Sequence, residues 1–311
     1  MSVSNLMLCG LIVFLPETFG VTEWGFGRYI KYEPGNMSLI LTAPHGGNRN
    51  PSRQSTGKMW PDRTDYGCKG KDGKCIWTHN CGPTSTDCKT RKLSDLHTVK
   101  VTRDIADRIK EITGFRPHVV YNLLRRSKLD ANREVNEATC NVSDAIKAFQ
   151  DYNNFICKAR SAISDRGLLL DIHGSADQKQ RTELGYLIHS KHLDSESYSK
   201  DVTSIRSLGR HWCGDDNNCF KNFICGNRSL GHFMNLEGLH AVPSPENKKV
   251  KLDVVHYFSG GFTVAKYGSR DGGDIDGIQM EFSREIRSRW GENTRNKIVN
   301  AILCFHRLNY T

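Results

Sequence analysis

The chain has 311 residues, of which 37% are hydrophobic and 25% are charged, a composition typical of a folded globular protein rather than of a disordered or fibrous one. Lys and Arg outnumber Asp and Glu by 44 to 34, which gives a formal net charge of +10 and favours acidic partners. The sequence contains no block of basic residues of the kind that binds nucleic acid, so we do not expect a nucleic-acid-binding protein.

The first 20 residues have the features of a secretory signal peptide. Leu6 to Leu15 is an apolar run that is too short to cross a bilayer, and Pro16 ends it. Thr18 and Gly20 supply the small residues needed for cleavage after Gly20, although no Lys or Arg precedes the run. The alternative is a short buried helix. We therefore expect a secreted protein with one catalytic domain over 21–311 and no membrane anchor.

The cysteines fit an oxidising compartment. One of the 11 cysteines lies in the signal peptide, and the even number that remains allows up to five disulfides. The four cysteines within 61–92 are 7, 6 and 7 residues apart, unlike the tight pairs of a zinc knuckle. We therefore expect irregular, disulfide-stapled insertions at 61–92 and at 213–249. Four sequons predict N-glycosylation at Asn36, Asn141, Asn227 and Asn309.

Strand-like and helix-like segments alternate along the chain, which predicts an α/β layer fold. The expected strands cover 38–43, 117–124, 167–174, 183–190 and 277–286. The expected helices cover the segment from an N-cap at Ser94 to a stop at Gly114, then 143–163, then 292–307, because apolar residues recur there at helical spacing.

Several strands end in polar residues. His45 follows the first strand, Asp171 and His173 end the central one, Glu281 lies near the end of the last, and Asp95 opens the first helix. Sites in α/β proteins form at the carboxyl ends of strands. Two histidines and one carboxylate from separate elements are a typical set of catalytic zinc ligands, with one position left for water.

In that interpretation Glu281 is the general base, and Asp171 either supports a ligand histidine or caps a loop. The glycines after His45 and His173 would leave room beside the metal. The alternative is that both histidines are structural and hydrogen-bond to loops.

A cluster of charged residues lies within 123–139, "LLRRSKLDANREVNEAT". Arginines near a metal suit bidentate binding of a substrate carboxylate. The alternative is an exposed charged loop leading into a helix.

Together the segments "APHGG", "RSKLDANRE", "LLLDIHG", "ELGYLI" and "IQMEFSREIR", in this order over 39–287, resemble the N-formylglutamate amidohydrolase-like family, and most of all its secreted eukaryotic members. The resemblance implies a zinc-dependent amidohydrolase with the fold of zinc exopeptidases, which is a mixed, mostly parallel sheet flanked by helices. It implies Zn²⁺ ligands at His45, Asp95 and His173, with Asp62 and Asp65 as rivals for the carboxylate, and Glu281 as the catalytic residue.

The family's DxNR motif falls on Asp130, Asn132 and Arg133, with Arg126 before it, and is expected to shape the site and hold an acidic substrate. After the central histidine, "HGSADQKQR" replaces the further glycine–histidine pair expected of relatives. We therefore expect a different substrate selection, with Arg181 and Glu183 taking part.

Formylglutamate is a cytoplasmic intermediate, which a secreted protein would not meet, so we expect amide hydrolysis on an acidic N-acyl amino acid or glutamyl peptide. The alternatives are a zinc carboxypeptidase, a cell-wall amidase, or a non-catalytic secreted binding protein with this fold. The sequence leaves the oligomeric state open.

Overall fold

The structure is a computed structural model that describes residues 20–52, 56–65, 69, 89–175, 181–250 and 257–311. The expected signal peptide, apart from Gly20, and the four cysteines of the 61–92 segment lie outside the described residues.

The described strands form one sheet of eight strands in the order β1-β2-β4-β3-β5-β8-β6-β7. The four central strands, β4, β3, β5 and β8, are parallel to one another, whereas β2 and β6 flank them antiparallel. This confirms the expected mixed, mostly parallel sheet. The strands are β1 (Glu23–Trp24), β2 (Ile30–Glu33), β3 (Leu39–Ala43), β4 (His118–Asn122), β5 (Gly167–Gly174), β6 (Thr182–Gly185), β7 (Ala241–Val242) and β8 (Ile275–Phe282).

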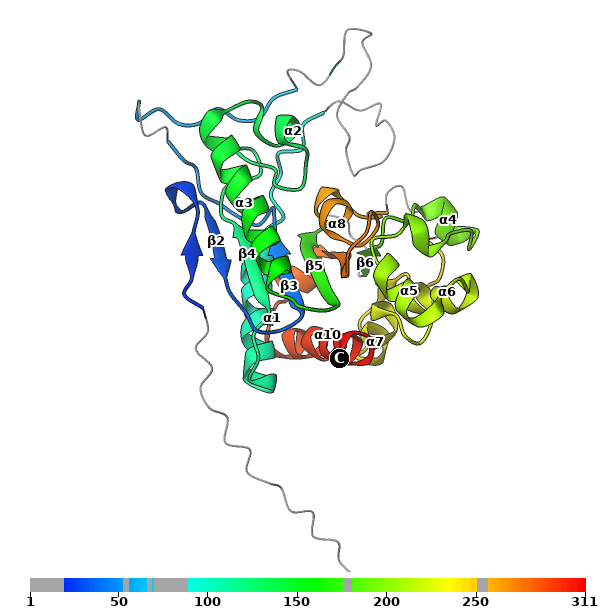
Figure 1. The fold of residues 1–311 in the computed structure, drawn as a ribbon. Helices are drawn as coiled ribbons and strands as arrows, with labels where there is room; N and C mark the ends of the chain where they lie inside the picture. Colours follow the sequence, from blue (N-terminus) through cyan, green and yellow to red (C-terminus); the bar gives the residue numbers. More distant parts are fainter. Residues whose placement is uncertain (1–19, 53–55, 66–68, 70–88, 176–180, 251–256) are drawn as a thin grey trace, which may run out of the picture.

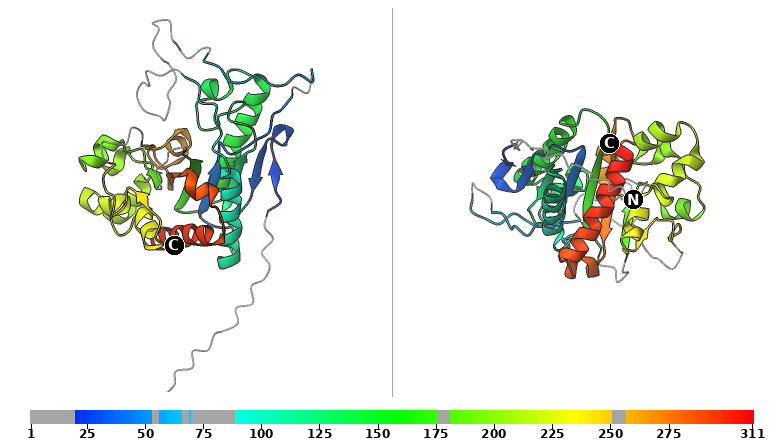
Figure 2. Two further views of the ribbon diagram at one scale, coloured as in Figure 1. Left: turned by 180° about the vertical axis from the view of Figure 1, so that it is seen from behind. Right: turned by 90° about the horizontal axis from the view of Figure 1, so that it is seen from below.

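Helices cover both faces of the sheet (Figures 1 and 2). Helices α1 (Thr98–Thr113) and α10 (Glu292–Tyr310) pack on one face, and α3 (Ser143–Ser161) and α8 (Phe262–Tyr267) pack on the other. Leu168 and Leu170 of β5 join the core on the α1 face, and Leu169 joins the core on the α3 face. Because side chains alternate along a strand, Asp171 and His173 share the face of Leu169.

The remaining helices are short. They are α2 (Val135–Thr139), α4 (Ser190–Asp194), α5 (Arg206–Cys213), α6 (Asn217–Cys225), α7 (Leu230–Leu236) and α9 (Arg284–Ser288), with 3₁₀ turns at Phe26–Arg28 and Lys200–Val202. No helix in the described part of the chain is long and apolar enough to cross a membrane.

The first long helix begins later than the sequence predicts. Helix α1 starts at Thr98, after His97 in a left-handed conformation with φ +72°, and ends at Gly114 with φ +76°, as expected. Ser94 is not its N-cap, because the Ser94 hydroxyl accepts a hydrogen bond from the Arg126 amide instead. The turn that holds Asp95 therefore lies outside the helix.

The 213–249 segment is less irregular than the sequence predicts, because it contains helices α6 and α7 and strand β7. Phe220, Phe223 and Ile224 of α6 are buried in the main core, because their i, i+3, i+4 spacing gives the helix an apolar face. Figure 1 shows α4, α5, α6 and α7 gathered at the side of the molecule opposite β1 and β2. One disulfide joins Cys213 to Cys219.

The sequence allows up to five disulfides, and among the described cysteines one pair, Cys213 and Cys219, is bonded. Cys140, Cys157, Cys225 and Cys304 are free thiols. Of the four sequons, Asn36, Asn141 and Asn227 are exposed. The fourth, Asn309, is fully buried, and its amide nitrogen donates to the carbonyls of Arg228 and Phe305. A glycan at Asn309 therefore does not fit this structure.

Candidate metal centre and active site

Three polar side chains converge at the carboxyl edge of the sheet. His45 follows β3, His173 lies on β5, and Asp95 lies in the turn before α1. The amide of Asp95 donates to the carbonyl of His45 at 3.1 Å, and the carbonyl of Asp95 accepts from the amide and the hydroxyl of Thr98. These main-chain bonds fix the Asp95 turn between β3 and α1, so its carboxylate points at the two imidazoles.

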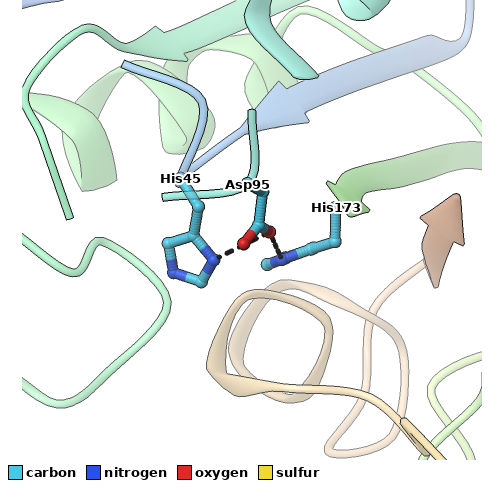
Figure 3. A group of neighbouring side chains, drawn as sticks. All are labelled: His45, Asp95 and His173. Carbon is cyan, nitrogen blue, oxygen red and sulfur yellow. Dashed lines mark hydrogen bonds and ion pairs between the residues drawn. The ribbon is translucent and has the colours of Figure 1, made fainter. Parts of the chain in front are cut away.

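The trio of His45, Asp95 and His173 is buried and compact (Figure 3). Asp95 Oδ2 lies 3.3 Å from Nδ1 of His45 and 3.1 Å from Nδ1 of His173. One ligand atom from each residue lies within 4.8 Å of the other two. Asp62 and Asp65, the rival carboxylates, lie elsewhere: Asp62 pairs with Lys128 at 2.8 Å, and Asp65 accepts from the amide of Thr90.

The outer nitrogen of each imidazole faces a second carboxylate. His45 Nε2 lies 2.6 Å from Asp130 Oδ1, and His173 Nε2 lies 2.8 Å from Asp171 Oδ2. If each Nε2 donates its proton to that carboxylate, the lone pair of each Nδ1 faces inward, toward Asp95. The outer carboxylates thereby orient both rings for binding a cation. Asp171 makes the supporting contact that we expected of it.

Buried carboxylates gather around the trio. Asp95, Asp130, Asp171 and Glu281 are all buried here, and Arg126 pairs with two of them, Asp130 and Asp95. Asp171, Asp95 and Glu281 raise the pKa of His173 well above its usual value, against the opposing effect of burial. In the tautomer described above, the two Nδ1 atoms and Asp95 Oδ2 are three ligand atoms that face one point. The donor set of two imidazoles and a carboxylate therefore fits a zinc ion.

Glu281 lies beside the trio, on β8, where it is the register partner of His173. Its Oε1 accepts from the Gln279 side chain at 2.9 Å and lies 3.9 Å from His173 Nδ1. Its Oε2 is buried and has no hydrogen-bond partner among the described residues. Burial raises the pKa of Glu281 to about 7, which suits a group that exchanges a proton near neutral pH.

The predicted substrate-binding arginines are engaged with the protein. Arg126 Nε donates to Asp130 at 2.8 Å, and its Nη1 lies 3.6 Å from Asp95 Oδ1. Arg133 is buried, pairs with Glu137 and donates to the carbonyl of Asn132. Its guanidinium therefore stabilises the start of α2 in this structure, and a substrate contact for Arg133 stays a prediction.

The other two residues of the charged motif contact the imidazoles. Asp130 bonds to His45, as described above, and the side-chain nitrogen of Asn132 lies 3.3 Å from His173 Nε2. The side-chain oxygen of Asn132 accepts from the amide of Thr263 at 2.7 Å, which ties the motif to α8. These contacts fit a role in shaping the site.

Arg181 and Glu183 form a pair on β6, at the neighbouring strand. Arg181 Nη2 donates to Glu183 Oε1 at 2.9 Å, and Glu183 Oε2 accepts from the amide of Phe258. Glu183 is also the register partner of Glu281. The pair therefore borders the site beyond β8, and a substrate contact for Arg181 stays a prediction.

The structure gives its own explanation for the glycines that follow His45 and His173. A Cβ on Gly46 would lie 2.3 Å from the Thr98 hydroxyl, and one on Gly174 would lie 2.4 Å from Cζ of Arg287. The glycines therefore leave room for α1 and for Arg287.

The roles of two buried arginines near the site could not be predicted from the sequence. Arg287 donates to the carbonyls of Leu96, Ser175 and Phe282, at distances of 2.6 to 3.2 Å, and so links the Asp95 turn to the ends of β5 and β8. Arg63 lies 3.5 Å from Asp130. An arginine that binds distant carbonyls looks like any surface arginine in a single sequence, although Arg287 lies within one of the motifs quoted above.

No protein-family model matches the sequence, and no curated protein matches it. Among solved structures, the chain is similar to an N-formylglutamate amidohydrolase from Ralstonia eutropha JMP134, with 11% identity, a TM-score of 0.46, and coverage of 90% of this chain and 96% of that chain. It is similar to a succinylglutamate desuccinylase from Chromobacterium violaceum, with 9% identity, a TM-score of 0.37, and coverage of 94% and 70%.

The CwlD amidase from Clostridioides difficile, in complex with the GerS lipoprotein, has 11% identity and a TM-score of 0.29, with coverage of 87% and 98%. At such identities, and with TM-scores below 0.5, these likenesses carry no argument about activity. Membership of the N-formylglutamate amidohydrolase-like family stays a prediction, and the function is argued from the side chains of the site.

Proposed function

We propose that the protein is a zinc-dependent hydrolase of amide bonds, in which His45, Asp95 and His173 hold the metal. The observation that carries the proposal is the convergence of three ligand atoms within 4.8 Å of one another. Next to them lies the buried carboxylate of Glu281, whose Oε2 has no hydrogen-bond partner among the described residues. When bound, zinc supplies a Lewis acid that activates water and an amide carbonyl.

Glu281 is the general base of the proposed reaction. Gln279 holds Oε1, so Oε2 is the atom that takes a proton from the attacking water and later passes it to the leaving amine. A pKa of about 7 allows the carboxyl group to hold and release that proton near neutrality. Asp130 and Asp171 keep the imidazoles in one orientation throughout.

The proposed substrates are acidic N-acyl amino acids or glutamyl peptides. The net charge of +10 favours an acidic substrate over a basic one. We also propose that the protein acts outside the cell, which agrees with the disulfide between Cys213 and Cys219 and with the exposed sequons at Asn36, Asn141 and Asn227.

The test is a hydrolysis screen of the purified protein with added zinc, on N-acyl glutamates, N-acyl alanines and glutamyl peptides. We expect amine release that a chelator abolishes and zinc restores. Hydrolysis that resists the chelator would contradict the metal mechanism. Zinc binding without hydrolysis of any substrate would favour the alternative of a non-catalytic binding protein.

A further inference from the structure

Arg287 lies where three segments of the site meet. It belongs to α9, about one turn beyond the end of β8, and its side chain is buried. Its Nη1 donates to the carbonyl of Leu96 at 2.6 Å, its Nη2 to that of Ser175 at 2.6 Å, and its Nε to that of Phe282 at 3.2 Å. One guanidinium therefore joins the turn before α1 to the ends of β5 and β8.

A positive charge in this place has a cost that an apolar side chain would avoid. Burial lowers the pKa of the Arg287 guanidinium, because the protein interior solvates its charge less well than water does. A methionine would fill much of the same space without that cost. The planar fork of an arginine can instead hold several carbonyls in fixed directions at once, so the three carbonyl bonds are what the arginine adds here.

The segments that Arg287 joins also hold the carboxylate of Asp95. The amide of Gly174 donates to Asp95 Oδ2 at 3.1 Å. Arg287 bonds to the carbonyl of the residue after Gly174, which is Ser175, and to the carbonyl of the residue after Asp95, which is Leu96. It therefore fixes the chain on both sides of this hydrogen bond, at the amide that donates and at the carboxylate that accepts.

Asp95 depends on such contacts more than the two histidines of the trio do. His173 lies on β5 and His45 follows β3 closely, so the sheet itself sets their positions. Asp95 lies in a turn that ends before α1 begins at Thr98. Its own main chain is held by bonds to His45 and Thr98, and the direction of its carboxylate depends on what surrounds the turn.

We propose that Arg287 is a positioning residue of the metal centre, which holds the Asp95 carboxylate between the two imidazoles before a cation binds. This rests on the metal site of the proposed function and deepens it. A ligand that is already in place loses little freedom when the metal binds, so the bonds of Arg287 raise the affinity for the metal. Arg287 acts through Asp95 and is not itself a ligand.

The test measures metal binding with and without the Asp95 side chain. Four proteins form a double-mutant cycle: wild type, Arg287→Met, Asp95→Ala and the double variant. Each is freed of metal and titrated with zinc in competition with a chelating indicator, and thermal unfolding shows that it is folded. The matched control is Arg166→Met, because Arg166 also donates to a main-chain carbonyl, that of Asn309, but lies just before β5 begins.

We expect Arg287→Met to raise the zinc Kd about ten-fold when Asp95 is present, and to leave the Kd unchanged in the Asp95→Ala protein, where no carboxylate remains to be positioned. Arg166→Met keeps the wild-type Kd even if its stability falls. The visible spectrum of bound Co²⁺ depends on the ligand set, and in Arg287→Met it should shift toward the spectrum of Asp95→Ala. A loss of stability alone would not produce that shift.

An unchanged zinc Kd in Arg287→Met would overturn the proposal. So would an equal rise of the Kd in both backgrounds, because Arg287 would then affect the site without acting through Asp95. If Arg287→Met does not fold, Arg287→Lys replaces it in the cycle with the same expected direction of change, since lysine keeps the charge but lacks the planar fork.

The outcome is separate from that of the proposed function. Amide hydrolysis by the wild type together with an unchanged Kd in Arg287→Met removes the positioning role and leaves the function. The expected changes in Kd without hydrolysis of any amide remove the function and leave the positioning role.

Discussion

Two pairs of buried histidines lie near the ends of the strands, one pair at the carboxyl ends and the other at the amino ends. Carboxylates surround the first pair, whereas neutral polar groups contact the second. At the carboxyl edge, His45 and His173 are surrounded by Asp95, Asp130 and Asp171. At the amino edge, His118 bonds to the Tyr32 hydroxyl and the Gly35 amide, and His306 bonds to Ser38.

The difference appears in the pKa values. Burial lowers the pKa of His118 to about 4 and also lowers that of His306, whereas the carboxylates raise the pKa of His173. Burial of a histidine therefore says little about function. What distinguishes the carboxyl ends of the strands is a set of buried carboxylates around two imidazoles, arranged so that three ligand atoms converge.

The largest expected effect at the carboxyl edge follows removal of the base. Glu281→Gln should lower amide hydrolysis by about 10²- to 10⁴-fold while zinc content stays the same, since Glu281 is not one of the trio. Steady-state kinetics and metal analysis of the same sample give the two readouts. Near-normal turnover would remove Glu281 from the mechanism.

At the amino ends of the strands, a change at His118 should alter the stability of the protein rather than its activity. The pKa of His118 is lower in the folded protein, about 4, than in the unfolded chain, about 6.5. The unfolded state therefore binds more protons between these values, and stability falls as the pH falls through this window, by up to about 3 kcal/mol.

His118→Phe should remove that contribution. Urea unfolding at several pH values should show a smaller loss of stability between pH 6.5 and pH 4.5 than in the wild type, whatever the offset at neutral pH. Parallel curves for the two proteins would contradict the lowered pKa of His118.

Removal of a carboxylate that orients an imidazole should weaken zinc binding less than removal of a ligand does, but by a measurable amount. Asp171→Asn should weaken zinc binding about 10- to 100-fold, because the amide holds the His173 ring less strongly in the required tautomer. Asp62→Asn is the matched control, because Asp62 is an exposed carboxylate that pairs with Lys128. Competition titrations with a zinc indicator give the affinities, and an equal loss in both variants would argue against the role of Asp171.

A smaller effect is expected on the pH profile. Hydrolysis requires the deprotonated form of Glu281, so kcat/KM should fall as the pH falls through the pKa of Glu281. Gln279 donates to the charged carboxylate, and Gln279→Leu should raise that pKa and move the acid limb to higher pH by up to about one unit. An acid limb that does not move would show that another group controls it.

The sequence predicts correctly those strands and helices in which apolar residues recur with the period of a strand or of a helix. Strand β5 has the predicted bounds, and α3 and α10 bury Phe149, Ile302 and Phe305 as expected. The positions of His45 and His173 could also be predicted, because the apolar runs in the sequence show where the buried parallel strands end.

Other features depend on contacts between distant residues, and these were missed or misjudged. Asp95 was expected to open the first helix, but its place beside His45 rests on a turn that the helical pattern does not reveal. Asn309 is buried beside Arg228, and Gly174 makes room for Arg287. None of these partners is indicated by local sequence.

The most direct measurement is the zinc content of three proteins: wild type, His173→Ala and His118→Ala, each dialysed against zinc and then against metal-free buffer. The account predicts about one zinc per chain in the wild type and in His118→Ala, and almost none in His173→Ala. Equal zinc content in the two histidine variants would contradict the assignment of the metal to the carboxyl edge of the sheet.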